Sequence, residues 1–336
     1  MYLSLGVPAV LPLGLITVKA EEERKICLMG VTLQHPPTQI FAFRTDGFAL
    51  TGARAQDALP YAESFMSHHR THPSVTLELE QATLKFMGLG ANPLIALGVG
   101  RALAWASDLE GTDSLALARA LDIQASHALE LWAFDRGGLL WVETPSAAEG
   151  MPQVHQRHAI EHAAKREDWV FVFHFPPVPF STPSQLGIQR RRNLLQVVPH
   201  LDLSALDEAS AAVQSGIEED QLDLFADALK DVIAINRAAL KAGGRPYPQA
   251  SEEDREVLRL MKEEGAVLAD RTPMGLGRFA LIEGAEPSLR MRTRMRAVLG
   301  YARGTITATI TDNEGARQVV RDEPVRMRFL RSDMDH

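Results

Sequence analysis

The feature that most limits how this chain can fold is a glycine loop that runs into a long apolar segment. The loop reads Gly88-Leu89-Gly90-Ala91-Asn92, and apolar residues in 94–109 recur at steps of three or four. This period predicts a helix, with Asn92 as its N-cap and Pro93 in its first position. Glycines before a helix let a ligand approach the backbone, and free amides at the helix start favour phosphate. The same spacing also occurs in ordinary strand-to-helix turns.

The segments on either side of this loop predict an α+β fold. Strand-like runs punctuated by Pro and Gly precede it, and strand-like runs alternating with segments of helical period follow it. Asp113 or Thr112 would cap the second helix, and Ser251 and Gly265 would bound the fourth. Predicted strands cover residues 27–33, 39–43, 74–79, 138–143, 169–175, 279–283 and 305–311, and predicted helices cover 94–109, 114–121, 218–241, 252–264 and 289–299.

A proline-rich stretch marks the predicted boundary between two domains. Four prolines lie within residues 176–183, and such clusters are typical of connecting segments. We therefore expect an N-terminal domain over residues 1–178, a C-terminal domain over 179–325 and a tail over 326–336.

Charge and cysteine content exclude several classes of protein. The chain has 35 Lys and Arg against 43 Asp and Glu, a net charge of -8, whereas nucleic-acid binding needs a basic face. The single cysteine, Cys27, excludes an intramolecular disulfide framework and is expected in the core. No apolar run approaches the roughly 20 residues of a membrane span, and the apolar start lacks the features of a signal peptide. We expect a cytoplasmic protein that binds neither nucleic acid nor membrane.

Three histidines suggest a metal site by their spacing. His155, His158 and His162 are three and four residues apart, so they would share one face of a helix, where imidazoles can bind zinc. The surrounding residues are rich in Gln, Arg and Lys, and a solvent-facing cluster is therefore the competing interpretation. The chain contains neither a His-Glu-x-x-His motif nor a Gly-x-Ser-x-Gly nucleophile elbow.

Several short motifs, each common alone, carry a resemblance to a known family by their order. The chain holds Leu13-Gly14-Leu15-Ile16, the Gly88 loop, Ala133-Phe134-Asp135-Arg136-Gly137-Gly138, Asp168-Trp169, Gly265-Ala266-Val267 and Thr272-Pro273-Met274-Gly275-Leu276-Gly277. Over about residues 1–285 this series resembles the β-ribofuranosylaminobenzene 5′-phosphate synthases of the GHMP kinase superfamily.

The resemblance implies a fold, a reaction and a site. The fold is a two-domain GHMP-kinase-like structure, with an N-terminal domain like domain 2 of ribosomal protein S5 and a ferredoxin-like C-terminal domain. The reaction joins phosphoribosyl pyrophosphate to 4-aminobenzoate, releases CO₂ and pyrophosphate, uses Mg²⁺ and serves methanopterin biosynthesis. Family analogy also implies a homodimer. The implied binding residues are Gly88, Leu89, Gly90, Ala91, Asn92, Asp135, Arg136, Arg190, Arg191, Gly275 and Gly277.

The chain departs from the family pattern at the loop and near it. The family continues Ser-Gly-Thr-Gln where this chain has Ala91-Asn92-Pro93-Leu94, so a hydroxyl and one amide donor are missing. Residues 126–130 stand in place of an Arg-Ser-Gly-Ile-Gly stretch, and Pro12 stands in place of a histidine. Arg190 and Arg191 could replace the lost anion contacts, or form a solvated helix face. Two further hypotheses follow: a non-catalytic homologue that acts as a partner or regulator in the same pathway, and an ATP-dependent small-molecule kinase.

Overall fold

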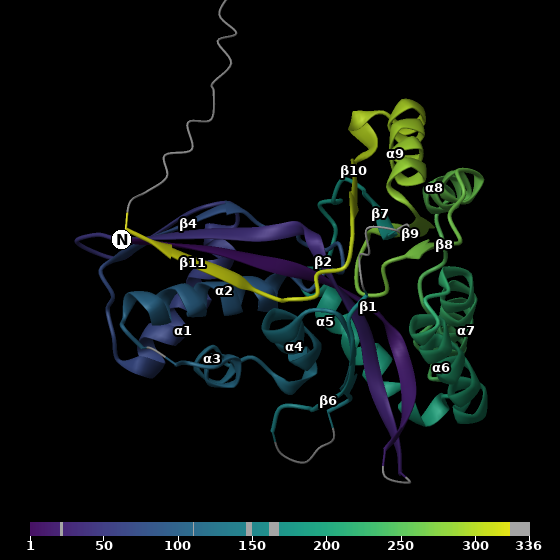
Figure 1. The fold of residues 1–336 in the computed structure, drawn as a ribbon, viewed down its shortest axis with the longest axis horizontal. Coiled ribbons are helices and arrows are strands. Elements are labelled where there is room, and N and C mark those ends of the chain that lie inside the picture. Colours follow the sequence, from purple (N-terminus) through teal and green to yellow (C-terminus); the bar gives the residue numbers. More distant parts are fainter. Residues whose placement is uncertain (21–22, 110, 146–149, 161–167, 323–336) are drawn as a thin grey trace, which may run out of the picture.

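The computed structural model of the chain describes residues 1–20, 23–109, 111–145, 150–160 and 168–322. In this part of the chain, two β-sheets are surrounded by helices (Figure 1). The strands of the larger sheet are β1 (Tyr2–Ala20), β2 (Glu23–Arg44), β3 (Ala49–Gly52), β4 (Val75–Gln81), β5 (Leu139–Glu143), β6 (Val154–His158) and β11 (Arg317–Arg321). Those of the smaller sheet are β7 (Trp169–Phe175), β8 (Leu268–Arg271), β9 (Arg278–Glu283) and β10 (Thr305–Thr309).

The helices gather at two ends of the larger sheet. One group packs around the start of β1 and the other around its far end and the smaller sheet (Figure 1). The α-helices are α1 (Ala55–His69), α2 (Ala91–Ala106), α3 (Ser114–Ala120), α4 (Ala128–Arg136), α5 (Leu186–Gln196), α6 (Leu203–Glu218), α7 (Leu222–Ala242), α8 (Glu252–Glu263) and α9 (Ala285–Leu299). Short 3₁₀ turns cover η1 (Ala125–His127), η2 (Val198–His200) and η3 (Tyr301–Arg303).

The hairpin of β1 and β2 connects the two ends of the molecule. The strands pair antiparallel from Tyr2 opposite Phe43 to Ala20 opposite Glu23. One half of β2 pairs with β4 and the other half with β5. Two register shifts interrupt the pairing of β1, one of them between Pro12 and Gly14, and such bulges bend a strand and increase its twist. The bend lets a single hairpin support both groups of helices.

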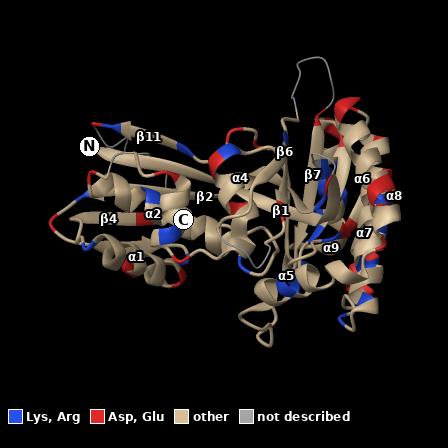
Figure 2. Ribbon diagram, turned by 90° about the horizontal axis from the view of Figure 1, so that it is seen from below, with Lys and Arg blue, Asp and Glu red and all other residues tan. Residues whose placement is uncertain are grey.

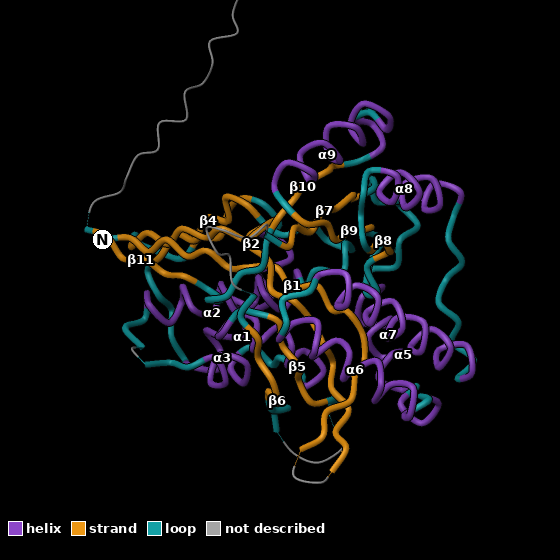
Figure 3. The backbone as a smooth tube through the Cα atoms, turned by 45° about the vertical axis from the view of Figure 1, so that its right-hand side comes forward, coloured by secondary structure: helices purple, strands orange, loops and turns teal. Residues whose placement is uncertain are grey.

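Side chains of α6 and α7 take the place of a strand along one edge of β1. The neighbouring strand β11 pairs with β1 only from Tyr2 to Gly6. Farther along, the Asn236 amide accepts from Leu15 N at 2.7 Å and donates to Leu15 O at 2.9 Å. The Ser210 hydroxyl accepts from Thr17 N at 3.0 Å. Figure 3 shows α6 and α7 beside this part of β1. These contacts satisfy backbone groups that burial would otherwise leave without partners.

The smaller sheet divides the apolar core in two. Its strand order is β10-β7-β9-β8, and all pairs are antiparallel. Phe171 and Phe173 of β7 join the main core, whereas Val170 and Val172 pack with residues of α8 and α9. Both faces of β7 are therefore buried, which explains its continuous apolar sequence. Because β7 precedes residue 178 and pairs with strands that follow it, the sheet crosses the predicted boundary in sequence; the division itself stays a prediction.

Most of the elements expected from the sequence are confirmed. The strand 169–175 matches β7 at both ends, and Asp113 caps α3 through a bond from Ala116 N. Ser251 caps α8 in a capping box with Asp254, and Gly265 follows the helix with a φ of 97°. The expected α+β architecture is the observed one. The expectation that Cys27 lies in the core is also confirmed, since it is fully buried and burial raises its thiol pKa to about 12.

Two local expectations were wrong, and some elements were not predicted. The helix after the glycine loop begins earlier than expected, at Ala91, because Gly90 in the left-handed region is the N-cap in place of Asn92. His155 and His158 lie on strand β6, where side chains three residues apart point to opposite faces of the sheet, so they share no helix face. His162 lies outside the described residues. Finally, β1, α1 and α6 were not anticipated as elements.

Within the described ranges, none of the helices is both long enough and apolar enough to cross a membrane.

Candidate functional site

The glycine loop lies between strand β4 of the larger sheet and the buried helix α2. Gly88 and Gly90 have φ values of 79° and 65°, in the region that favours glycine. A Cβ atom at Gly90 would lie 2.6 Å from Val10 Cγ1 and 2.8 Å from Glu130 Cγ. Glycine is therefore required at this position both by its dihedral angles and by close packing. As a result, the loop brings the first amides of α2 next to the buried side chain of Glu130.

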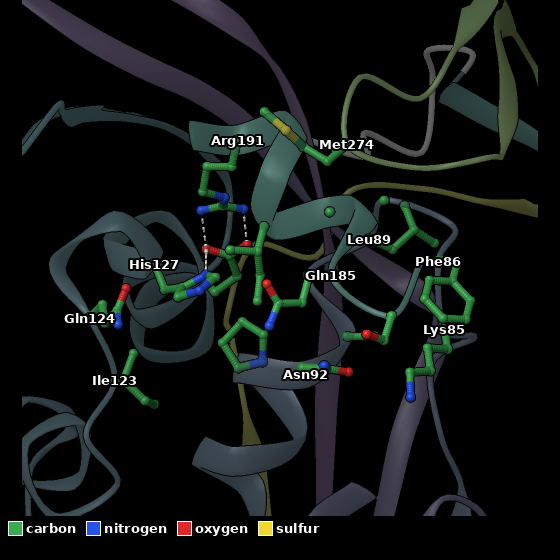
Figure 4. A pocket seen from close by; sticks show the side chains of 18 of the residues that line it. Lys85, Phe86, Leu89, Asn92, Ile123, Gln124, His127, Gln185, Arg191 and Met274 are labelled. Atoms are coloured by element: carbon green, nitrogen blue, oxygen red, sulfur yellow. Dashed lines mark hydrogen bonds and ion pairs between the residues drawn. The ribbon is translucent and has the colours of Figure 1, made fainter. Parts of the chain in front are cut away.

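A cavity of about 360 Å³ opens in front of this loop. It lies at the start of α2, where unpaired amides and the helix dipole favour a negatively charged group. Figure 4 shows side chains from the loop, from α4 and its preceding turn, and from α5 facing this space. The lining residues are Tyr61, Leu84, Lys85, Phe86, Gly88, Leu89, Gly90, Ala91, Asn92, Pro93, Asp122, Ile123, Gln124, His127, Glu130, Ser184, Gln185, Gly187, Ile188, Arg191, Arg192 and Met274. We call it the loop cavity.

A buried ion pair between α4 and α5 forms the back wall of the loop cavity. Arg191 Nη1 donates to Glu130 Oε2 at 2.7 Å, and Arg191 Nη2 donates to the other carboxylate oxygen. The two residues are only 5% and 1% exposed. Burial alone would raise the pKa of Glu130, but the charge of Arg191 and the nearby His127 ring, whose Nδ1 lies 3.7 Å from Glu130 Oε2, lower it to about 2. Figure 4 shows Arg191 and His127 pointing toward one another at this wall.

Other charged side chains near the loop are held by local partners. Arg54 donates to the Asn92 side-chain oxygen and to Thr83 O, the latter at 2.7 Å. Lys85 Nζ lies 2.9 Å from Asp57 Oδ1. These contacts tie the first turn of α2 to the start of α1 and leave the Asn92 oxygen occupied.

A second loop, between β8 and β9, packs directly on the first. Leu276 N donates to Phe86 O at 2.7 Å, and a Cβ atom at Gly275 would lie only 2.1 Å from Gly88 N. Gly277 lies behind it, where a Cβ atom would be 3.1 Å from Met87 O. Gly275 and Gly277, predicted as binding residues, thus bring two glycine loops into backbone contact.

The three consecutive arginines of α5 point in three directions. Successive residues on a helix are about 100° apart, and α5 lies between the two groups of helices (Figure 2). Arg191 points to Glu130, Arg192 is exposed at the rim of the loop cavity, and Arg190 lies on the other side. The three arginines therefore form neither a single anion-binding cluster nor a single solvent-exposed face of the helix.

Arg190 belongs to a smaller second cavity, which we call the arginine cavity. Its volume is about 60 Å³, and it shares Met274 with the loop cavity. The guanidinium groups of Arg190, Arg237 and Arg271 lie 5.3, 5.0 and 4.6 Å from the centre of the Tyr247 ring. Such distances are typical of cation–π contacts.

The arginines of this cavity differ in their acidic partners. Arg237 is paired with Asp270 at 2.6 Å, and Arg271 lies 3.6 Å from Asp254. Arg190 donates to Gly275 O, and among the described residues no carboxylate pairs with it. Burial lowers the pKa of Arg190, which favours any bound anion that compensates its charge.

Asp135 and Arg136, also predicted at the site, line neither cavity. Asp135 accepts a hydrogen bond from Ser114 Oγ at 2.9 Å, and the Arg136 guanidinium lies 4.8 Å from the Trp132 ring centre. Both side chains are exposed at the end of α4. Their assignment as binding residues stays a prediction.

The glycine loop and the carboxylate behind it offer few of the oxygen ligands that Mg²⁺ prefers, which are carboxylate, carbonyl and hydroxyl oxygens. Asp122 and Ser184, which also line the loop cavity, do carry such oxygens. Ala91 has no hydroxyl, the Asn92 oxygen accepts from Arg54, and both Glu130 oxygens accept from Arg191. Across the described part of the chain, no three His, Cys, Asp or Glu side chains are grouped so as to hold a metal ion. The glycine loop itself therefore supplies no free side-chain oxygen to a magnesium ion.

Comparisons with known proteins identify the fold. No protein-family model matches the chain, and no curated protein matches it in sequence. Among solved structures, homoserine kinase from Cytophaga hutchinsonii is similar, with a TM-score of 0.65 and 13% identity over 95% of this chain and 97% of that chain. Mevalonate diphosphate decarboxylase from Staphylococcus aureus has a TM-score of 0.63 and 15% identity over 95% and 99%. Mevalonate kinase from L. major, in complex with R-mevalonate, has a TM-score of 0.63 and 11% identity over 92% and 96%.

These structures define a class by its fold. The chain has the two-domain α+β fold of the GHMP kinases, as the sequence motifs predicted. At such low identity the likeness extends to the fold alone. The resemblance to the synthase branch remains a prediction.

Sequence reasoning missed several residues of the two cavities. Glu130 carried a signal, since it is a charged residue between the apolar residues Leu129 and Leu131, and buried charges need partners. Its partner Arg191 lies 61 positions away, a separation that no local pattern shows. Tyr247 and Lys85 carried no signal in the sequence.

Proposed function

We propose that this chain is a small-molecule transferase that holds the diphosphate of its donor in the loop cavity. The single observation that carries this proposal is the pairing of two cavities. One lies at the positive end of α2, the other is lined by arginines, and Met274 lines both. Two cavities that share a lining residue suit a donor and an acceptor that must come into contact for group transfer.

On the donor side, the loop supplies backbone groups rather than charges. Gly88 and Gly90 bring the chain close to any ligand, and the 16-residue helix α2 directs its positive end at the cavity. Pro93 has no amide to give. The backbone amides that remain free to donate are therefore those of the loop and of the first two residues of α2. These donors are enough to bind a diphosphate.

On the acceptor side, the arginine cavity suits an aromatic carboxylate. A guanidinium binds a carboxylate through two parallel hydrogen bonds. Unlike Arg237 and Arg271, Arg190 has no acidic partner among the described residues. The half-buried Tyr247 ring offers an apolar surface beside it. A 4-aminobenzoate-type acceptor has both features.

Two donors are compatible with this geometry. The motif resemblance supports phosphoribosyl pyrophosphate, in a synthase-type reaction that releases CO₂ and pyrophosphate on a methanopterin-type pathway. The kinases among the similar structures support ATP instead. Both donors carry a diphosphate, and they differ in the group transferred. A homodimer is proposed by family analogy only.

A second candidate is a catalytically degenerate homologue that acts as a partner or regulator of a pathway protein. The observation that favours it is that the site lacks a hydroxyl and that its buried carboxylate already has a partner within the chain. Ala91 provides no hydroxyl, and Arg191 saturates the Glu130 carboxylate.

Turnover assays separate these candidates. Carboxyl-labelled 4-aminobenzoate with phosphoribosyl pyrophosphate should release labelled CO₂, and both ligands should raise the melting temperature by binding the folded state. ADP formation from ATP with an added acceptor would instead favour the kinase. Absence of any product, together with co-purification of a pathway protein from the native cell, would favour the degenerate homologue.

A matched pair of ligands tests the acceptor cavity. Aniline lacks the carboxylate of 4-aminobenzoate, so the wild-type protein should bind 4-aminobenzoate at least tenfold more tightly. In Arg190→Met this preference should shrink. If the variant keeps the full preference, the arginine cavity is not the acceptor site.

A further inference from the structure

The lining of the arginine cavity carries charge of one sign. Arginines reach it from α5, from α7, from the segment that follows α7 and from the end of β8, whereas none of its described lining residues is Asp or Glu. The four are Arg190, Arg237, Arg245 and Arg271. Like charges that share a small, partly buried space repel one another unless opposite charges lie nearby. The question is therefore which of these guanidinium groups the protein itself compensates.

Acidic residues behind the lining compensate two of the four arginines at most. Asp270 pairs with Arg237 at 2.6 Å. Asp254 lies 3.6 Å from Arg271, but it also pairs with Arg278 at 2.7 Å, so its single charge is shared between two guanidinium groups. These two acids leave the charges of the other two lining arginines unmatched.

Arg190 and Arg245 donate to backbone oxygens, which carry no net charge. Arg190 Nη1 donates to Gly275 O, and Arg245 Nη1 donates to Gly243 O at 3.1 Å. In the part of the chain that the structure describes, neither guanidinium is paired with a carboxylate. Burial, and to a smaller extent the charge of Arg271, lower the pKa of Arg190. This direction is the one expected of a cation without a compensating anion.

The two unmatched arginines approach the cavity from different depths. Arg190 is half-buried, whereas Arg245 is exposed. Tyr247 follows Arg245 by two residues, and its hydroxyl donates to Thr272 O at 2.9 Å, which fixes the ring beside Arg190. Because both arginines line one cavity of about 60 Å³, a single ligand held against this ring can reach both.

We propose that the acceptor carries two negative charges close together, which Arg190 and Arg245 bind jointly. This inference rests on the proposed function, since it takes the arginine cavity as the acceptor site. It narrows the acceptor to the dianions, because a ligand with one charge would leave one of the two guanidinium groups unmatched. An aromatic amine with two carboxylates and one with a phosphoryl group both meet this description, and arginine binds either group through paired hydrogen bonds.

The test compares three aromatic amines by calorimetry on the full chain. The ligands are 4-aminobenzoate, 5-aminoisophthalate and 4-aminophenyl phosphate, at about pH 8, where the phosphoryl group has lost its second proton. At least one of the two dianions should bind about tenfold more tightly than 4-aminobenzoate, the effect of one further charged contact. The tighter dianion identifies the source of the second charge. If both dianions bind no more tightly than 4-aminobenzoate, the inference is wrong and the proposed function stands. Binding of none of the three would overturn both.

Variants of Arg245 assign the second charge to its place. Arg245→Met should remove most of the preference for the dianion, whereas Arg245→Lys keeps the charge and should retain much of it. Arg290→Met, which removes an exposed arginine of α9, is the matched control and should show the preference of the wild type. If Arg245→Met keeps the full preference, Arg245 does not hold the second charge and the inference is wrong. The comparison of ligands on the wild-type protein needs no variant, so it decides the question even if Arg245→Met does not fold.

Discussion

The carboxylate of Glu130 on α4 and the guanidinium of Arg191 on α5 form a two-bond ion pair immediately behind Gly90. Sixty-one residues separate them in sequence. Their pairing fixes α5 against α4 and thereby positions the other two arginines of α5, one at each cavity. The same ion pair therefore fixes the packing of α5 and determines where its charged side chains lie.

Removal of one member of this pair should be far more harmful to stability than removal of both. Glu130→Ala leaves a buried guanidinium without its acid, which costs about 3–5 kcal/mol in such settings. The double variant Glu130→Leu with Arg191→Met leaves no unpaired charge and should be close to neutral. Urea unfolding measures all three proteins. A double variant as unstable as Glu130→Ala would show that packing, and not charge, accounts for the loss.

His174 should make the folded protein sensitive to moderate acid. Its Nε2–H donates to Arg303 O at 3.0 Å, and its Nδ1 accepts from Arg278 at 3.2 Å, so the neutral ring is fully bonded. Burial, and then the charge of Arg278, lower its pKa from 6.5 to about 4. Between these values the unfolded chain binds a proton that the folded chain does not, so stability falls as the pH falls.

The expected loss from this histidine, from neutral pH to about pH 4, is about 3 kcal/mol. Urea unfolding at several pH values measures it, with His174→Gln as the comparison, since glutamine does not titrate. The slope of stability against pH should be shallower in the variant over this window. Equal slopes in the two proteins would contradict the assignment.

Gly275→Ala should disturb the contact between the two glycine loops. The added Cβ would meet Gly88 N at 2.1 Å and Met87 C at 2.2 Å, both backbone atoms. Overpacking of this kind costs about 1–3 kcal/mol, and displacement of Gly88 should also weaken pyrophosphate binding. Gly47→Ala is the matched control, because nothing lies within 4 Å of its Cβ position. If Gly275→Ala binds pyrophosphate as the wild type does, the contact between the two glycine loops does not position the ligand site.

Asn236→Leu should destabilise the fold although it places an apolar residue on a buried helix face. The amide of Asn236 satisfies both backbone groups of Leu15, and each buried group left unpaired costs about 1–3 kcal/mol. Lys230→Leu, on the exposed side of the same helix, should stay within about 0.5 kcal/mol of the wild type. Thermal unfolding of the two variants provides the comparison, and equal stabilities would contradict this role for Asn236.

The sequence predicted those helices and strands that bury only one face or that carry a capping residue at one end. Ser251, Asp113 and Gly265 each mark a helix end by local chemistry, and the structure places them there. In the sequence, Asn236 interrupts the apolar face of α7 with a polar side chain. Its reason, the edge of β1, lies more than two hundred residues away and could not be inferred.

The elements and contacts that the sequence did not predict were missed for physical reasons. Strand β1 is buried on both faces, so it lacks the alternation by which strands are recognised. For the site, the loop and its neighbours could be predicted because a glycine turn before a helix is a local signal. The division of Arg190, Arg191 and Arg192 among different partners depends on how α5 is packed, and only the structure supplies that information.

The most direct test of this account is a crystal structure of the protein grown with phosphoribosyl pyrophosphate. We predict the diphosphate in the loop cavity, bound by the amides of residues 88–92, with the Arg191–Glu130 pair intact behind it. A diphosphate bound elsewhere, or a metal ion on Glu130 with Arg191 displaced, would contradict the account.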